Sequence, residues 1–222
     1  IGKYFLPFSF DRRGRKGDFA PFESEYRAEN RPFDKEAEGM EQTIQSYLES
    51  IKGKRVAVLG IGVSNTPLIQ MLVRSDVKVT ACDKRSREDF GGRIEALESL
   101  GVKVYLGEDY LEHLRGQDVI FRTPGMRPDL PQLVDAVEKG SVLTSEMEVF
   151  FQVCPCPIIA VTGSDGKTTT TTIIAELLKA AGKNVYLGGN IGKPLLPEVE
   201  MIEPTDVAVV ELSSFQLMTM DR

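Results

Sequence analysis

Short apolar runs of strand length alternate with amphipathic stretches of helical length along most of the chain. A helical pattern with one apolar face follows Met40, and an alternation of strands and helices begins near Gly53. Strands that alternate with helices form parallel sheets with right-handed crossovers. In this first part the pattern predicts strands at 55–60, 77–83, 103–106, 118–122 and 141–144, and helices at 66–75, 93–100 and 131–139.

The same alternation starts again after a Cys-Pro-Cys-Pro stretch. It predicts strands at 158–162, 184–187 and 207–211. It also predicts one long helix at 167–181. We therefore predict an α/β protein with two parallel-sheet domains, at 40–146 and 147–222. The second sheet is only half built, so we expect 147–222 to be the N-terminal part of a truncated domain.

Residues 1–39 do not share this pattern. They contain a basic, glycine-broken segment at 11–17 and six phenylalanines without a helical or strand period. We interpret this stretch as a poorly ordered or non-native extension, and Met40 as the natural start. A basic arm that binds a partner is the alternative.

Composition and charge exclude several kinds of protein. The net charge of −6 argues against non-specific binding of nucleic acid, which needs a basic face. No apolar run approaches the roughly 18 residues of a membrane span. Cys154 and Cys156 have neither a redox nor a zinc spacing, so we expect free thiols in a reducing cytosol. His113 is the only histidine, and nothing near it supports a Ser-His-Asp triad.

A first glycine turn, Gly60-Ile-Gly62-Val-Ser-Asn65, follows the first strand and opens a helix. Asp83 lies at the end of the next strand. This is close to the dinucleotide fingerprint of Rossmann-like domains, but Asn65 replaces the third glycine. Three interpretations stay open from these residues: a nicotinamide or flavin site, a site for another nucleotide diphosphate, and a purely structural turn.

A second glycine turn, Thr162 to Thr169, also lies between a strand and a helix. Its glycines free the backbone to wrap phosphate oxygens, Lys167 supplies a point charge, and the Thr168 hydroxyl can bind Mg²⁺. Val161 stands where the usual P-loop has its first glycine. The alternative is an ordinary capped helix, but the pattern favours a P-loop.

Three segments together resemble the Mur ligase family. The loop Thr-Gly-Ser-Asp-Gly-Lys-Thr-Thr is the variant found in Mur ligases and folylpolyglutamate synthases. Gly189-Asn-Ile-Gly192 is similar to a Mur ligase element. Glu211-Leu-Ser-Ser-Phe-Gln-Leu217 resembles the segment of the branch that adds D-glutamate. The three occur in the family's order, and the resemblance covers 40–222.

This resemblance implies that the first glycine turn binds the UDP part of UDP-N-acetylmuramoyl-L-alanine and not a nicotinamide cofactor. The family usually has Thr-Gly at Ser64-Asn65. The positions that match substrate contacts of the family are Gly62, Val63, Ser64, Asn65, Asp83, Lys84, Arg85, Thr123, Pro124 and Gly125, with Asn190 and Gln216 in the second domain.

The resemblance also implies an ATP and Mg²⁺ site in the second domain. Lys167 and Glu211 are the expected catalytic residues, and Thr168 and Glu211 the expected metal ligands. For Glu211, a solvated carboxylate at a strand end is the alternative. The expected ATP-binding residues are Gly163, Ser164, Asp165, Gly166, Lys167, Thr168 and Thr169.

The implied reaction is ATP-driven amide formation with D-glutamate through an acyl phosphate, by a cytoplasmic monomer that makes peptidoglycan precursors. The resemblance places a second metal site and the D-glutamate-binding domain beyond these residues, so we expect the chain alone to be inactive. The alternatives are another Mur-type ligase or folylpolyglutamate synthase, a P-loop NTPase with a dinucleotide-binding domain, and a module that senses UDP precursors.

Overall fold

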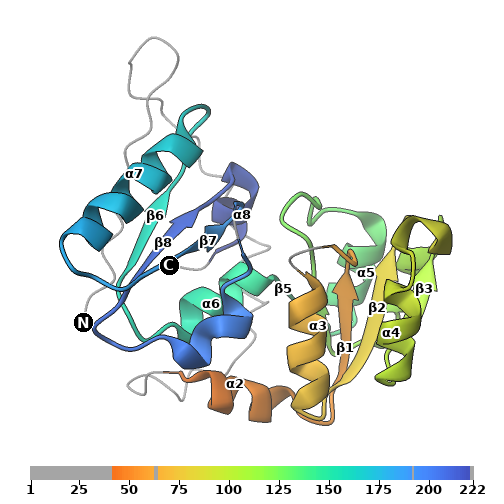
Figure 1. The fold of residues 1–222 in the computed structure, drawn as a ribbon. Coiled ribbons are helices and arrows are strands. Elements are labelled where there is room, and N and C mark those ends of the chain that lie inside the picture. The colour runs from red at the N-terminus through yellow and green to blue at the C-terminus, as the bar shows by residue number, and fades with distance from the viewer. Residues whose placement is uncertain (1–41, 63–64, 192, 221–222) are drawn as a thin grey trace.

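The computed structural model describes residues 42–62, 65–191 and 193–220. In this part of the chain two parallel sheets lie side by side, each flanked by helices (Figure 1). This arrangement confirms the predicted α/β class with parallel sheets. The extension at 1–39, the start at Met40 and two expected substrate contacts, Val63 and Ser64, lie outside the described residues.

The first sheet has five parallel strands in the order β3-β2-β1-β4-β5. The chain adds β2 and β3 on one side of β1, then returns to add β4 and β5 on the other. In open parallel sheets, ligands bind beyond the carboxyl ends of the strands at such a change of direction. The strands are β1 (Arg55–Leu59), β2 (Lys78–Asp83), β3 (Lys103–Leu106), β4 (Val119–Phe121) and β5 (Val142–Thr144).

Helices cover both faces of this sheet, and alternation along β1 divides the core between them. Val56 and Val58 belong to a buried cluster that includes residues of α3 (Asn65–Arg74) and α4 (Arg93–Ser99). Ala57 and Leu59 belong to a second cluster, with residues of α5 (Pro131–Glu138) and the 3₁₀ helix η3 (Tyr110–Leu114). These four side chains of β1 are fully buried, as expected for a parallel strand covered on both faces, whereas Arg55 at its start is exposed.

The second sheet has three parallel strands in the order β6-β8-β7. They are β6 (Ile158–Val161), β7 (Val185–Gly189) and β8 (Val207–Glu211). The central strand β8 ends at Glu211, which pairs with Val161 on one side and with Gly189 on the other. The long helix α7 (Lys167–Ala180) packs against β7 and β8, and α8 (Ser214–Thr219) follows β8.

The observed boundaries agree with the predicted ones within one or two residues, but several elements were not predicted. These are α6 (Glu146–Val153) and three 3₁₀ helices, η2 (Arg87–Phe90), η3 and η4 (Leu196–Met201). The start of α6 carries the Ser-x-x-Glu signature of a helix N-terminus, and the Ser145 hydroxyl accepts the Glu148 N–H at 3.2 Å. The helix α2 (Ile44–Ile51) lies where the pattern after Met40 predicts it.

The two sheets are joined through α6 and η4. The Glu146 carboxylate at the start of α6 accepts the backbone N–H of Leu196 at 2.7 Å. Gln45 of α2 donates to Glu200 of η4 at 3.3 Å. Apolar side chains of α6, η4 and α3 lie in one buried cluster, so the apolar core continues from one sheet to the other. Within the described ranges, no helix has the length and apolar character needed to cross a membrane.

Candidate functional site

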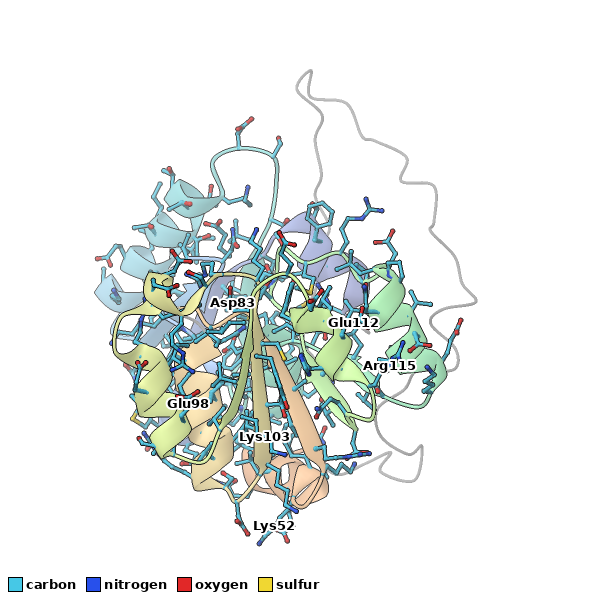
Figure 2. All side chains as sticks on the ribbon, turned by 90° about the vertical axis from the view of Figure 1, so that its right-hand side faces the viewer. Lys52, Asp83, Glu98, Lys103, Glu112 and Arg115 are labelled. Atoms are coloured by element: carbon cyan, nitrogen blue, oxygen red, sulfur yellow. The ribbon has the colours of Figure 1, made fainter. Side chains whose placement is uncertain are left out.

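A pocket of about 560 Å³ opens at the carboxyl edge of the first sheet, beyond β1 and β4. Figure 2 shows Asp83 at this edge and Lys52 at the opposite end of the sheet. The pocket contains eight of the positions that matched substrate contacts: Gly62, Asn65, Asp83, Lys84, Arg85, Thr123, Pro124 and Gly125. The sequence-predicted residues that the structure describes in the first domain therefore lie together, at the change of strand direction.

Gly60 fixes the distance between the two walls of the pocket. Its φ is +86°, a backbone conformation that favours glycine. A Cβ atom at this position would also lie 2.3 Å from the Thr123 methyl carbon. The turn after β1 and the loop after β4 can therefore approach each other only because residue 60 has no side chain.

Asn65 has a structural role at the position where the dinucleotide pattern has its third glycine. Its side-chain amide donates to the carbonyl oxygens of Leu59 and Gly60 at 2.9 and 3.0 Å, and the residue is buried. A glycine there would let the helix pack closely on the strand. Here an amide occupies that space and satisfies the carbonyls at the end of β1.

Asp83 stabilises the first glycine turn through hydrogen bonds to Ile61 and Arg85. One carboxylate oxygen accepts the Ile61 N–H at 2.7 Å and the Arg85 guanidinium at 2.9 Å, and the other accepts two further Arg85 donors. Burial opposes ionisation of Asp83, but the hydrogen bonds from Arg85 and Ile61 outweigh it, so the pKa of this carboxyl lies below its ordinary value. Arg85 also donates to the Ile61 carbonyl and lies 4.2 Å from the centroid of the Phe90 ring.

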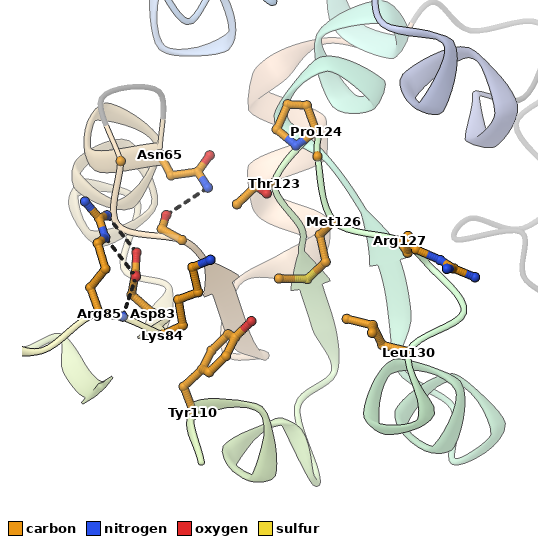
Figure 3. A pocket seen from close by; sticks show the side chains of 13 residues that line it. Asn65, Asp83, Lys84, Arg85, Tyr110, Thr123, Pro124, Met126, Arg127 and Leu130 are labelled. Carbon is orange, nitrogen blue, oxygen red and sulfur yellow. Dashed lines mark hydrogen bonds and ion pairs between the residues drawn. The ribbon is translucent and has the colours of Figure 1, made fainter. Parts of the chain in front are cut away.

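The pocket also contains residues that sequence reasoning missed. Figure 3 shows Lys84 and Tyr110 extending toward the middle of the pocket, whereas Arg127 points outward, where it pairs with Asp129. Tyr110 begins a 3₁₀ helix, which leaves no periodic signal in the sequence. The residues after Gly125 could have been found, because they continue the loop after β4. The missed lining residues are Gly60, Tyr110, Met126, Arg127 and Leu130.

The second glycine turn connects β6 to α7. Gly163 and Gly166 have φ values of +157° and +72°, so both adopt conformations that favour glycine. The Lys167 ammonium donates to the Gly163 carbonyl at 2.8 Å and to the Ser164 carbonyl at 3.3 Å. The lysine therefore folds over its own loop. A loop of this kind before a helix N-terminus is suited to bind phosphate.

Glu211, at the end of β8, holds side chains from two other elements. One carboxylate oxygen accepts the Thr168 hydroxyl at 2.7 Å, and the other accepts the Asn190 amide at 3.4 Å. The Asn190 N–H donates to the Glu211 carbonyl at 2.8 Å. Glu211 is only 3% exposed, so the alternative of a solvated strand-end carboxylate is wrong.

The oxygen atoms at Glu211 and Thr168 fit a magnesium ion that would bind together with phosphate. Magnesium prefers oxygen ligands and usually takes one or two from the protein, with water and phosphate oxygens for the rest. The Thr168 hydroxyl and the Glu211 carboxylate would supply two such oxygen atoms. Among the described residues there is no group of three or more His, Cys, Asp or Glu side chains that could hold a metal by themselves.

Gln216, expected near the substrate, takes part in a helix cap. Its side-chain oxygen accepts the Ser213 N–H at 2.9 Å, and its own N–H donates to the Ser213 hydroxyl at 3.2 Å. The residue is 2% exposed. Gln216 thus stabilises the start of α8, shortly after Glu211.

The remaining predicted residues of the second glycine turn, Ser164, Asp165 and Thr169, are exposed beside Lys167.

Two domain families match the chain. The model of the Mur ligase MurD-like N-terminal domain matches residues 54–145, which contain the pocket. The model of the Mur ligase middle domain matches residues 161–222, which contain the second glycine turn and Glu211.

Curated relatives and solved structures are similar to the chain. The UDP-N-acetylmuramoylalanine–D-glutamate ligase of Ruminiclostridium cellulolyticum is 56% identical over 180 residues, which cover 81% of this chain and 39% of the relative. The ligase of the same name from Acetivibrio thermocellus is 52% identical over 183 residues, which cover 82% and 39%. The chain thus spans about two fifths of the length of these relatives.

Among solved structures, a murein peptide ligase from Psychrobacter arcticus has a TM-score of 0.42 at 22% identity, with 72% of this chain and 37% of that chain covered. The two domain matches and the identity to the curated relatives are sufficient: the chain belongs to the Mur ligase family.

Proposed function

We propose that the protein containing this chain is an ATP-dependent ligase that joins D-glutamate to UDP-N-acetylmuramoyl-L-alanine, in the synthesis of peptidoglycan precursors. The names of the relatives support this reaction, and the activity is proposed for the whole protein, of which these residues form one part. The observation that carries the proposal is the contact of 2.7 Å between Thr168 of the phosphate loop and Glu211.

The proposed chemistry requires two anions to meet. A carboxylate oxygen of the muramoyl-alanine attacks the γ-phosphorus of ATP, which releases ADP and forms an acyl phosphate. The D-glutamate amine then attacks the acyl carbon, loses a proton and expels phosphate. Lys167 and the N–H groups of its loop lower the repulsion between the carboxylate and the phosphates. A magnesium ion held by Thr168 and Glu211 would neutralise further phosphate charge.

The contacts of Lys167 support this role. Its ammonium donates to the Gly163 and Ser164 carbonyls of the loop. The positive charge of Lys167 therefore lies over the loop that would bind phosphate, where it can offset phosphate charge. Because the substrate carboxylate attacks ATP directly, the proposed reaction needs no covalent intermediate with a protein side chain.

We propose that the pocket on the first sheet binds the UDP end of the substrate. Its volume of about 560 Å³ lies within the range of small-molecule sites. Lys84 adds a cation beside the glycine turn, where a diphosphate would lie (Figure 3). Asp83 and Arg85 stabilise the conformation of the turn, because each is hydrogen-bonded to Ile61.

The test is release of ADP by the product of the complete reading frame that contains this sequence. We would supply ATP, Mg²⁺ and UDP-N-acetylmuramoyl-L-alanine, and vary the amino acid. Release only with D-glutamate is expected. Release with another amino acid would keep the ligase and refute the specificity. ATP hydrolysis without any amino acid would instead favour an NTPase, and binding without turnover a sensor.

Two variants make this test specific for the site. Glu211→Gln removes the charge beside Thr168 but keeps the side-chain shape, so we expect ADP release to be lost. Glu138→Gln makes the same change on the exposed surface of α5, so its activity should equal that of the parent protein.

We also infer a cytoplasmic location, because ATP is available there and the described cysteines are free thiols. Cell fractionation checks this location.

A further inference from the structure

Cys154 and Cys156 lie beside each other in the segment between α6 and β6. Their Sγ atoms are 3.6 Å apart. Both residues are nearly buried, with 7% and 4% of their surface exposed, and both are free thiols. They belong to neither the pocket nor the phosphate loop, so the proposed ligase reaction does not explain their contact.

Two prolines hold these thiols in place. Pro155 and Pro157 have fixed φ angles, and each restricts the preceding cysteine to extended backbone. Cys154 accordingly has φ −66° and ψ 122°. The backbone of the two cysteines is therefore already restricted, and it loses little conformational freedom when the thiols react.

The spacing of the two cysteines permits a disulfide. Cα atoms two residues apart are separated by at most about 7 Å, and disulfides join Cα atoms roughly 4.4–6.8 Å apart. The sulfur atoms, now 3.6 Å apart, must approach by about 1.5 Å to reach bonding distance. A large backbone movement is therefore not required.

We propose that Cys154 and Cys156 are a reversible oxidation site, which closes to an intramolecular disulfide in the presence of a low-molecular-weight disulfide such as glutathione disulfide. The Cys154 thiolate attacks one sulfur of the oxidant, which releases the first thiolate and forms a mixed disulfide. Cys156 then loses its proton and attacks the Cys154 sulfur, which releases the second thiolate. The protein loses two protons and two electrons, and the oxidant becomes two thiols.

The two sulfurs have different environments, which assigns their order of reaction. The hydrogen bond with Cys154 and burial both raise the pKa of the Cys156 thiol. The two sulfurs share this contact, and either one can be its donor. Cys154 is also the more exposed of the two. Cys154 is thus the attacking residue and Cys156 the resolving one.

Closure of this bond would affect both neighbouring elements. The Cys154 N–H donates to the Phe150 carbonyl at 2.9 Å, at the end of α6. The carbonyl of Pro157 accepts the Ala208 N–H at 3.0 Å, at the start of the pairing between β6 and β8. The thiol pair therefore lies between two fixed points, at the base of the strand that leads to the phosphate loop.

The test is to treat the folded, purified protein with glutathione disulfide, then denature it, alkylate the remaining thiols and digest it with trypsin. Cys154 and Cys156 share the peptide 140–167, and Cys82 lies in the peptide 79–84. We expect the first peptide to lose two hydrogens and to escape alkylation, and a reductant to restore both thiols. Cys82 is the internal control, because it is fully buried without a partner thiol, and it should stay alkylated.

Two variants test the order of reaction. Cys156→Ser should trap a stable glutathione adduct on Cys154, because the resolving thiol is missing. Cys154→Ser should gain much less adduct. Equal alkylation of all three cysteines in the oxidised parent protein, or bridges only between molecules, would overturn the proposal without any variant. Equal adducts in both variants would overturn the assigned order.

Discussion

Gly189 lies against the backbone of Glu211, where the strands β7 and β8 end. A Cβ atom on Gly189 would come within 2.2 Å of the Glu211 carbonyl oxygen and 2.9 Å of its nitrogen. The φ of Gly189 is +98°, which strains any other residue. The glycine therefore allows the backbone after β7 to bring Asn190 to Glu211, where both its N–H and its amide donate.

We expect Gly189→Ala to lower the free energy of unfolding by about 3 kcal/mol or more, because backbone strain and a backbone clash add. The displaced Glu211 should also cost ATP turnover. Urea unfolding and ADP release measure the two effects. Gly92→Ala is the control, since an added Cβ there meets no atom within 4 Å. Comparable losses in both variants would show that the contact with Glu211 does not matter.

Thr168→Val should lower kcat about 100-fold or more, because it removes an oxygen from the charge-stabilising group around the phosphates and keeps the side-chain shape. The free energy of unfolding should change by much less. Steady-state ADP release and urea unfolding separate the two effects.

Thr172→Val is the matched control for this prediction. Thr172 lies one turn further along α7, is exposed, and donates its hydroxyl only to the Thr168 carbonyl among the bonds described. It should keep nearly the kcat of the parent protein. If both variants lost activity equally, the cause would be disturbance of the helix and not loss of the Thr168 oxygen.

Asp83→Asn should weaken binding of UDP and destabilise the turn, because an amide cannot form the ion pair with Arg85. The lowered pKa of Asp83 means that the folded protein binds fewer protons than the unfolded chain. Its stabilising contribution is therefore full above the unfolded pKa and is lost as pH falls through the folded one. The stability difference between parent and variant should be large at neutral pH and small in acid, as measured by urea unfolding.

The half-buried Asp135, which pairs with Lys139 at the surface, provides a control for this experiment. Asp135→Asn should change the free energy of unfolding by under about 1 kcal/mol, as is typical of surface ion pairs. UDP binding, measured by calorimetry, should be unaffected. A loss of UDP affinity in Asp135→Asn as large as that in Asp83→Asn would place the effect outside the pocket.

Glu146 predicts the opposite dependence on pH. Burial raises the pKa of its carboxyl to about 7, from an ordinary value of 4.5. Between these values the folded protein holds a proton that the unfolded chain has lost, so stability falls as pH rises. The contribution approaches about 3 kcal/mol over the window. In Glu146→Gln this decline between pH 4.5 and 7 should disappear from unfolding curves, whereas Glu138→Gln should retain it.

The sequence pattern was sufficient for the parallel sheets, because the residues that cover both faces of a buried strand must be apolar. Val56, Ala57, Val58 and Leu59 are consecutive and fully buried, and such a run is readily recognised. The second glycine turn between β6 and α7 was also recognisable, since Gly163 and Gly166 have conformations that other residues avoid, and its binding of phosphate stays a prediction. Whether the predicted site residues bind substrate stays a prediction.

The features that the sequence did not predict depend on contacts between residues that are far apart in the chain. The sequence shows Asn65 as a missing glycine, but only the fold reveals that its amide satisfies two carbonyls at the end of β1. Gln216 belongs to a motif that suggests substrate contact, whereas the structure places its side chain in the cap of α8. Tyr110 reaches the pocket because η3 follows β3, and short 3₁₀ helices have no apolar period to detect.

Helix α6 acts as a strut between the two sheets. Its eight residues span about 12 Å, and it is held at one end by Glu146 and capped at the other by Cys154. A short rigid rod transmits a rotation and does not absorb it. A rotation of one sheet against the other would therefore change the backbone at the ends of this helix, Ser145 and 154–157, and these positions set the angle between the two sheets.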